Sequence, residues 1–460
     1  MGRTIEADYL VVGAGAMGMA FVDTLVAETT ASVVVVDRNH QPGGHWTTAY
    51  PFVRLHQPSA YYGVNSRDLG SDTIDHSGLN AGYYELAGGA EVCAYFDGVM
   101  QQHLLPTGRV TYLPMSEYLG DGLVRTLGGD QIEVSARRVV TTHVNIVVPS
   151  MRPPSYAVAP GVDCVPPNDL PRIRDARDRY VIVGAGKTAM DACLWLLRHG
   201  IAPQRLTWIK PRDSWILDRA AVQPGRQFAK RTLADFSGQL TSVHEAESLG
   251  DLFDRLEARG CLLRIDTNVD PTMYRCAILS QAELETLRGV DDVVRMGHVQ
   301  AIEPGRVTLE GGILDIDGSA LYIDCTADGF GRKEPTPVFS DDHISLQTVR
   351  TCQPAFSAAT IAHVEAAYPD DDTRNAFCNP VPYPQEPTDW LRMMLTFNRN
   401  QLKWFSDPDM MAWVDAARLN VLHHVTAAVS ERAREKIISV LTSQLPAIND
   451  KLEKLLAQAG

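Results

Sequence analysis

The sequence lacks several features that would place it in a common class. Its 460 residues contain no apolar run of about 18 residues, so no membrane-spanning helix is predicted. The N-terminus lacks the basic segment, apolar core and cleavage site of a secretory signal, and we therefore expect a cytoplasmic protein. Positive charge is also scarce: 42 Lys and Arg against 56 Asp and Glu give a formal net charge of −14. This acidic balance predicts neither a nucleic-acid nor a membrane partner.

Cysteine is sparse and scattered. The eight cysteines include no C-x-x-C pair, which argues against a disulfide scaffold and a cysteine-rich zinc site. The histidines show no H-x-x-x-H spacing, so we predict no metal site. The C-x-x-x-x-C pair of disulfide reductases is also missing, and no dithiol exchange is expected.

A glycine pattern stands near the N-terminus. The segment YLVVGAGAMG, residues 9–18, places G-x-G-x-x-G directly after an apolar run that is typical of a buried parallel strand. In this pattern Gly13 permits a tight turn, Gly15 lets the backbone approach a pyrophosphate, and Gly18 lets the next helix pack closely. The first amides of that helix, at Ala16 and Met17, then face the anion.

The surroundings of this pattern support a dinucleotide site. Residues 19–28 have helical spacing, and residues 31–37 are typical of a second strand that ends in an acid. Asp37 is placed to accept hydrogen bonds from an adenosine ribose. The alternative is a fortuitous glycine turn, because the glycine pattern alone is weak evidence.

The pattern recurs in YVIVGAGKTA, residues 180–189, again after an apolar run. The residues predicted to bind a second dinucleotide are Gly184, Gly186, Lys187, Thr188 and Ala189. The next strand ends in Lys210 and Arg212 where an NAD-specific site would have an acid. Cations there suit a 2′-phosphate and predict NADPH, although both could instead be solvated surface charges.

The loop after Asp37 resembles a known family. Residues 37–46 (DRNHQPGGHW), followed by Tyr50-Pro51 and Arg54, are similar to the region after the first glycine pattern in class B flavin monooxygenases, which include the flavin-containing and Baeyer–Villiger enzymes. Residues 322–329 (YIDCTADG) look like the late strand of that family, which ends in A-T-G. The resemblance implies that the following residues contact FAD: Arg38, Gly44, His45, Trp46, Arg54 and Asp328. Taken singly, the glycines read equally well as a turn and Trp46 as a core aromatic.

The resemblance is incomplete. The Baeyer–Villiger segment F-x-G-x-x-x-H is absent from residues 140–180, which leaves the monooxygenase subclass open. Residues 62–67 are loosely similar to the T-N-x-S-K-E stretch of flavin-containing monooxygenases, which implies that the Asn65 amide supports a flavin hydroperoxide. The alternative is that Asn65 makes a turn. Arg54 is the other catalytic candidate: it could stabilise NADPH or a flavin peroxide, or it could simply be an arginine between two domains.

These patterns predict an α/β fold with two Rossmann-type domains, the second inserted in the first. Residues 1–150 and 330–390 would form the FAD domain and 171–329 the NADP domain. A helical insertion at about 213–290 would form a lobe, and 391–460 a helical C-terminal region that packs on the FAD domain or makes a homo-oligomer.

The sequence thus predicts an FAD-containing, NADPH-dependent oxidoreductase. The resemblance implies a monooxygenase that uses dioxygen and a C4a-hydroperoxyflavin on a small organic substrate. An NADPH-dependent flavin reductase or dehydrogenase, or a non-catalytic nucleotide-binding flavoprotein, remains an alternative.

Overall fold

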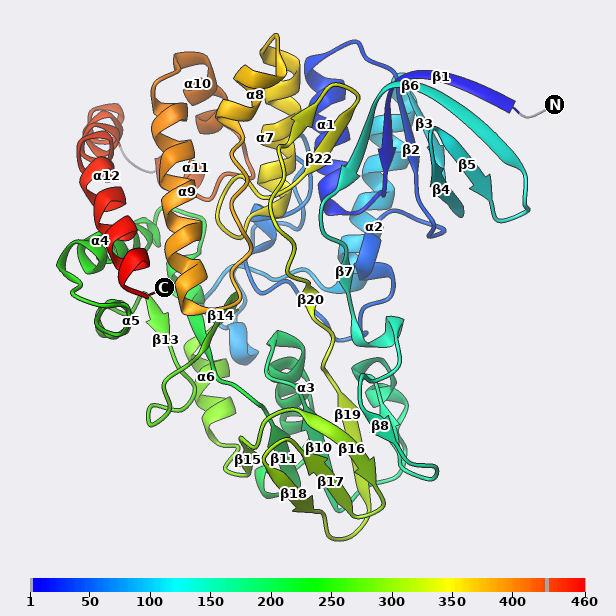
Figure 1. The fold of residues 1–460 in the computed structure, drawn as a ribbon, viewed down its shortest axis with the longest axis vertical. Helices are drawn as coiled ribbons and strands as arrows, with labels where there is room; N and C mark the ends of the chain where they lie inside the picture. Colours follow the sequence, from blue (N-terminus) through cyan, green and yellow to red (C-terminus); the bar gives the residue numbers. More distant parts are fainter. Residues whose placement is uncertain (1–2, 427–429, 460) are drawn as a thin grey trace.

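The computed structural model describes residues 3–426 and 430–459. Figure 1 shows an upper body of sheet and helices that holds the N-terminus, and a lower body built around a second sheet. A group of helices from the C-terminal part of the chain stands beside the upper body. Within the described residues, no helix is both long and apolar enough to cross a membrane.

The first sheet carries the N-terminal glycine pattern. Its order is β21-β22-β6-β1-β2-β3, and the hairpin β4–β5 extends it beside β6. The pairings from β22 to β3 are all parallel. The four valines of β2 are all buried, as in strands covered on both faces. The bounds are β1 Arg3–Val12, β2 Val33–Val36, β3 Val110–Leu113, β4 Ser116–Gly120, β5 Leu123–Thr126, β6 Gln131–Thr142, β21 Phe339–Ser340 and β22 His343–Leu346.

Helices α1 (Ala16–Glu28) and α7 (Pro354–Ala367) pack side by side against this sheet (Figure 1). Their first residues are 338 positions apart in the sequence, and most residues of both helices are buried. The other helices of this body are α2 (Gly89–Val99) and α8 (Asp371–Phe377). The first glycine turn is therefore supported by chain from both ends of the sequence.

The second sheet carries the repeated glycine pattern. Its order is β15-β11-β10-β19-β9, with every pairing parallel, and α3 (Lys187–Arg198) follows β10. A four-stranded sheet, β18-β17-β16-β8, belongs to the same body. The bounds are β8 Ala157–Val158, β9 Cys164–Val165, β10 Arg179–Val183, β11 Leu206–Ile209, β15 Val293–Val294, β16 Val299–Glu303, β17 Arg306–Leu309, β18 Gly312–Asp315 and β19 Ala320–Asp324. The mixed α/β fold with two Rossmann-type units is thus confirmed.

The chain crosses between the two bodies at a short two-stranded ribbon. The outgoing strand β7 (Ile146–Val147) pairs antiparallel with the returning strand β20 (Gly329–Phe330). Figure 1 shows this ribbon between the upper and lower sheets. The two crossings, far apart in sequence, are therefore tied together by backbone hydrogen bonds.

The segment 213–290 differs from the predicted helical insertion because it contains a sheet. Strands β12 (Ser214–Asp218), β13 (Leu262–Leu263) and β14 (Met273–Leu279) pair in the order β13-β12-β14. The runs SWILD and MYRCAIL are rich in apolar and β-forming side chains, which favour strands. The helices of the segment are α4 Ala229–Glu245, α5 Leu249–Ala258 and α6 Gln281–Arg288.

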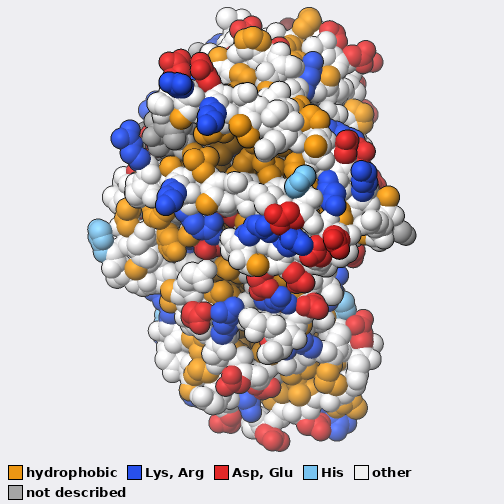
Figure 2. Space-filling model, turned by 90° about the vertical axis from the view of Figure 1, so that its left-hand side faces the viewer, with side chains coloured by type: hydrophobic (Ala, Val, Ile, Leu, Met, Phe, Trp, Pro, Cys, Tyr) orange, Lys and Arg blue, Asp and Glu red, His pale blue; other side chains and the backbone are white. Residues whose placement is uncertain are grey.

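The C-terminal helices pack on this lobe as well as on one another. The long helix α12 contacts both α9 and α4, and α9 contacts β14. The helical spacing over 410–430 predicts one helix, but the chain turns at Ala417–Leu422, and residues 427–429 lie outside the described part. The bounds are α9 Pro387–Phe405, α10 Pro408–Ala416, α11 His423–Thr426 and α12 Glu431–Ala459. On the face drawn in Figure 2, hydrophobic side chains gather in a recess in the upper half.

Candidate functional site: two nucleotide turns and the cavity between them

The first glycine turn has the close packing that its sequence predicts. Gly13 adopts a positive φ of 104°, and its N–H donates to the Val36 carbonyl over 2.7 Å. A Cβ at Gly18 would lie 2.0 Å from the Gly13 carbonyl oxygen, so only glycine fits. Helix α1 has Gly15 at its N-cap and no side-chain cap, which leaves its first N–H groups available to an anion.

Asp37 lies at the end of β2 and braces the turn. It is 5% exposed, and its two carboxylate oxygens accept from the Ala14 N–H at 2.6 Å and the Asn39 N–H at 2.7 Å. A carboxylate has about four acceptor positions, so two remain for ribose hydroxyls. Asp37 therefore orders the loop and stays able to bind a ribose.

The G-G-x-W loop folds back onto the first turn. The Gly43 N–H donates to the Ala14 carbonyl at 2.9 Å. Gly44 has a positive φ of 58°, and a Cβ there would come within 3.0 Å of the Gly15 Cα. Trp46 donates from Nε1 to the Tyr62 hydroxyl at 2.7 Å, and burial lowers the pKa of the neighbouring His45 to about 4. The loop and the turn thus form one cradle, whose uncapped helix amides and side-chain-free backbone fit a dinucleotide.

The second glycine turn is similar but more open. Gly184 has a positive φ of 136°, and a Cβ there would lie 2.7 Å from the Cys325 carbonyl oxygen. A Cβ at Gly186 would meet no atom within 4 Å. Helix α3 begins at Lys187, again without a side-chain cap, and Lys187 pairs with Asp191 one turn later. Thr188 is half-buried and Ala189 fully buried in this first turn.

The two predicted phosphate-binding cations lie in different environments. Lys210 is 2% exposed, and its Nζ is 2.5 Å from Asp213 Oδ1 and 4.6 Å from the centre of the Trp208 ring. Burial lowers the pKa of Lys210, and Asp213 offsets part of that effect. Arg212 is more exposed, with its Nη1 3.9 Å from Glu386. Arg212 is therefore free to meet a phosphate, whereas the charge of Lys210 is already balanced.

A cavity of about 370 Å³ lies between the two turns. The G-G-x-W loop lines it through His45 and Trp46, and the second turn through Lys187. The lobe and the C-terminal helices complete its largely apolar wall with side chains that include Phe236, Trp390, Met393 and Phe397. A second cavity of about 640 Å³ shares Arg54, Lys187 and Asp191 with it. The two cavities therefore meet where the predicted FAD and NADP residues meet.

The remaining predicted site residues are dispersed. Arg54 is exposed, lines both cavities, and donates from Nη1 to the Leu86 carbonyl at 3.4 Å. Asn65 lies in the tight turn between the bridged residues Val64 and Arg67 and lines neither cavity, although its Oδ1 is buried without a hydrogen-bond partner in the described structure. Asp328 is exposed and pairs with Arg275 at 3.3 Å. Arg38 is exposed beside Asp37. Their roles stay predictions.

Several cavity residues escape sequence reasoning because no local pattern marks them. Arg350 is 6% exposed, and its Cζ lies 5.1 Å from the ring centre of Phe356 and 5.4 Å from that of Phe397. Its Nη1 donates to the Asn420 Oδ1 at 2.5 Å. Burial lowers its pKa to about 10. Asp235 of α4 also lines the cavity, and burial raises its pKa to about 6. Both side chains come from segments without motifs.

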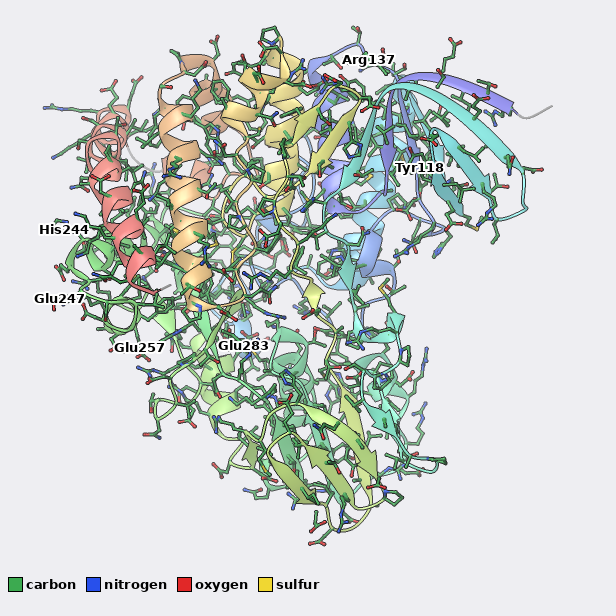
Figure 3. The ribbon with its side chains drawn as sticks, viewed as in Figure 1. Tyr118, Arg137, His244, Glu247, Glu257 and Glu283 are labelled. Carbon is green, nitrogen blue, oxygen red and sulfur yellow. A yellow bond between two sulfur atoms is a disulfide. The ribbon has the colours of Figure 1, made fainter. Side chains whose placement is uncertain are left out.

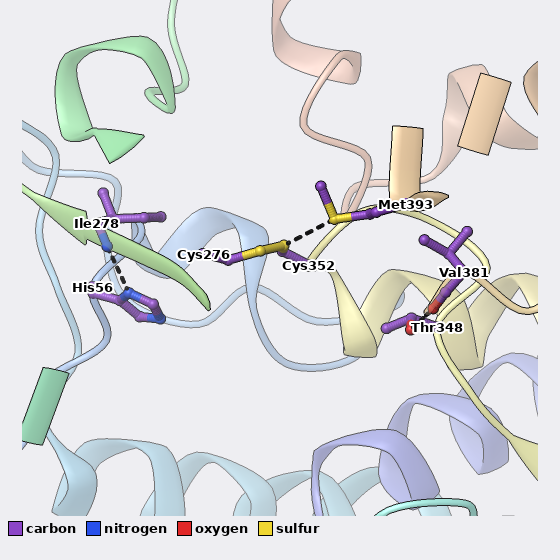
Figure 4. Close-up of a disulfide and its surroundings, with 7 residues drawn as sticks. All are labelled: His56, Cys276, Ile278, Thr348, Cys352, Val381 and Met393. Atoms are coloured by element: carbon purple, nitrogen blue, oxygen red, sulfur yellow. Dashed lines mark hydrogen bonds between the residues drawn. A yellow bond between two sulfur atoms is a disulfide. The ribbon is translucent and has the colours of Figure 1, made fainter. Parts of the chain in front are cut away.

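The cysteine spacing argues against a disulfide scaffold, but it does not reveal that the chain contains a disulfide. Cys276 and Cys352 form one, although 76 residues separate them, and both line the smaller cavity (Figure 4). The fold brings β14 next to the segment before α7, a pairing that no spacing rule detects. Within the described residues, no group of three or more His, Cys, Asp or Glu side chains is arranged to hold a metal ion.

Known proteins resemble this chain over different lengths. A family model described as an NAD(P)-binding Rossmann-like domain matches residues 11–65, which span the first glycine turn. The chain is 57% identical to Rv2000 of Mycobacterium tuberculosis (strain ATCC 25618 / H37Rv) over 461 residues, which covers 99% of this chain and 86% of that protein. It therefore belongs to the same family as Rv2000.

Among solved structures, the chain is similar to cyclohexanone monooxygenase from Rhodococcus sp. Phi1 bound to NADP⁺, at 15% identity and a TM-score of 0.48, over 94% of this chain and 99% of that one. It is also similar to a flavin-containing monooxygenase from Stenotrophomonas maltophilia, at 16% identity and a TM-score of 0.43, over 81% of this chain and 99% of that one.

Proposed function

We propose that this chain is an FAD-containing, NADPH-dependent monooxygenase that acts on a small organic substrate. The observation that carries the proposal is the cavity lined both by the G-G-x-W loop and by the second glycine turn. A hydride donor and its acceptor must meet in one space, and a cavity shared by two nucleotide turns meets that need. When bound, FAD supplies a two-electron carrier that accepts hydride and reacts with dioxygen.

The chain's own residues would bind and orient the two nucleotides. The α1 amides and Asp37 would hold the pyrophosphate and ribose of FAD, and Trp46 would fix the loop beside it. The α3 amides and Arg212 would hold NADPH. The apolar wall of the cavity, including Trp390 and Phe397, would exclude water and accept an apolar substrate.

The test is a visible spectrum of the purified protein during anaerobic NADPH addition and then on admission of air. We expect yellow protein that NADPH bleaches and air recolours. Substrate addition should then lower the peroxide released per NADPH consumed, because oxygen is transferred to the substrate. Flavin that NADPH cannot bleach would contradict the proposal.

An NADPH-dependent flavin reductase is the second candidate. It is favoured by the absence of the F-x-G-x-x-x-H segment from residues 140–180. A reductase would release one peroxide per NADPH with every candidate substrate, which separates it from a monooxygenase.

A further inference from the structure

The Cys276–Cys352 disulfide joins two parts of the molecule across the smaller cavity. Cys276 belongs to β14 of the lobe, and Cys352 lies two residues before α7, the helix packed on α1 (Figure 4). Their Cα atoms are 6.3 Å apart, within the range that a disulfide spans. The Cys352 sulfur is also 3.8 Å from the Met393 sulfur of α9. The pair therefore sits where the lobe, the first sheet and the C-terminal helices meet.

Both cysteines adopt an unusual backbone conformation. Cys276 has a φ of 54° and Cys352 a φ of 51°, values in the left-handed region that residues other than glycine rarely occupy. Such conformations persist only where the surrounding structure enforces them, and they are concentrated at functional sites. Two of them in one bonded pair point to a role beyond filling the core.

A bulge interrupts the pairing of β14 with β12 at Cys276. Tyr274 pairs with Trp215 and Ile278 with Leu217, so three residues of β14 lie opposite one residue of β12. The Ile278 N–H, beside this bulge, donates to His56 Nδ1 at 3.2 Å (Figure 4). Burial lowers the pKa of His56 to about 3, so its ring is neutral and able to accept. Bulges of this kind commonly reorient a side chain next to an active site.

The cavity that the pair lines is the one proposed to receive the reacting ends of both nucleotides. Trp46 and Arg54 line it from the predicted flavin loop and Lys187 from the second turn. Arg350, two residues before Cys352, places a buried positive charge on the same wall. A nearby cation favours the thiolate that forms when a disulfide opens.

We propose that Cys276 and Cys352 are a redox-active pair that accepts electrons from the dihydroflavin in this cavity. The S–S bond breaks, each sulfur gains one electron and one proton, and the dihydroflavin is oxidised to flavin by loss of two electrons and two protons. NADPH is the source of the electrons, so the inference rests on the proposed function. The fully reduced protein thus holds two electron pairs per flavin, one on the flavin and one on the sulfurs.

The test counts electrons and locates thiols in the purified holoprotein. Under anaerobic conditions, we expect wild type to take up two equivalents of NADPH or dithionite per flavin before excess reductant remains. Iodoacetamide followed by peptide mass spectrometry should then label Cys276 and Cys352 only after reduction. A Cys276→Ser/Cys352→Ser double variant should take up one equivalent. Cys164→Ser, a half-buried thiol outside both cavities, should keep two.

Failure of this inference is distinguishable from failure of the proposed function. Suppose that NADPH bleaches the flavin, but wild type takes up one equivalent and the two cysteines stay unlabelled. The cysteine pair is then not redox-active, and the inference is refuted while the proposed function stands. If NADPH does not bleach the flavin, the proposed function is refuted. The number of dithionite equivalents taken up per flavin then tests the redox role of the two cysteines: two equivalents support it and one contradicts it. The labelling of wild type needs no variant, so poor folding of the double variant leaves the test intact.

Discussion

Two glycines of the first turn are constrained in different ways. A Cβ at Gly18 would collide with the backbone of Gly13, so this glycine serves the packing of α1 on β1. A Cβ at Gly15 would make only an ordinary contact, 3.5 Å from the Gly44 Cα. Gly15 is therefore not required by local packing alone, and the predicted approach of a ligand phosphate would account for its place in the pattern.

Replacing Gly15 tests the first turn. We expect Gly15→Val to yield folded protein without flavin, because its branched side chain would occupy the space of the pyrophosphate. The measurement is the flavin absorbance per protein after purification. Gly98→Ala is the matched control, since a Cβ at this glycine of α2 meets no atom within 4 Å. A full complement of FAD in Gly15→Val would refute the assignment.

The two cations after β11 should differ on substitution. A charge-assisted hydrogen bond contributes roughly 1.5–3 kcal/mol, so Arg212→Ala should raise the KM for NADPH by roughly 10- to 100-fold and leave NADH use unchanged. Lys210→Met should instead lower the free energy of unfolding by about 1–3 kcal/mol, because it leaves Asp213 buried with Arg295 as its remaining partner. Steady-state kinetics with both donors, together with urea unfolding, checks both results. An equal rise in KM for NADPH and NADH in Arg212→Ala would show that Arg212 does not bind the 2′-phosphate.

Among the elements, a buried arginine is one of the links between the lobe and the first body. Arg219, which follows β12, is fully buried and pairs with Glu283 of α6 at 2.7 Å. Its other nitrogens donate to the His56 carbonyl at 3.2 Å and to Asn80 at 3.1 Å. Figure 3 shows Glu283 on the inner side of the lobe, toward the lower body. These contacts hold the lobe over the loop that follows Arg54.

The burial of Asp235 in α4 predicts a pH dependence of stability. Its pKa is raised from 3.8 to about 6 by burial, so the folded state holds the proton more tightly than the unfolded state. The stabilisation from this proton is present at low pH and is lost as pH rises through about 4 to 6. Asp235→Asn mimics the protonated form, so it should match wild type near pH 4 and exceed it by up to about 3 kcal/mol near pH 7. Urea unfolding across this range checks it, and a difference independent of pH would contradict it.

Some parts of the fold could be predicted from the sequence, and others could not. The two glycine turns, Asp37 and the G-G-x-W loop follow from local patterns, because each turn is made by residues close in sequence. The sheet in the lobe and the cavity wall do not, since Cys276, Cys352, Asp235 and Arg350 meet only through long-range packing. Lys210 shows a further limit: its position was predicted, but its pairing with Asp213 depends on burial that no motif encodes.

At the scale of the whole molecule, the two turns belong to different sheets that the β7–β20 ribbon connects. Each turn should therefore bind its nucleotide with its own effect on stability. A ligand at 100 times its Kd stabilises the folded state by about 2.7 kcal/mol. FAD and NADP⁺ should each stabilise the folded state by about this amount. A substitution in one turn should remove the stabilisation by one nucleotide only.

Gly186 allows this separation to be tested without disturbing the fold. It has an extended φ of −85°, which any residue can adopt, and a Cβ there meets open space. Gly186→Val should therefore cost at most about 1 kcal/mol in the absence of nucleotide, the order of a lost N-cap preference. The added side chain would fill the space over the α3 amides, so the stabilisation by NADP⁺ should disappear while that by FAD remains. Thermal unfolding with each nucleotide, compared with Gly15→Val, measures both increments. If Gly186→Val keeps the full NADP⁺ increment, the second turn does not hold the phosphates, because no pyrophosphate can approach amides that a valine covers.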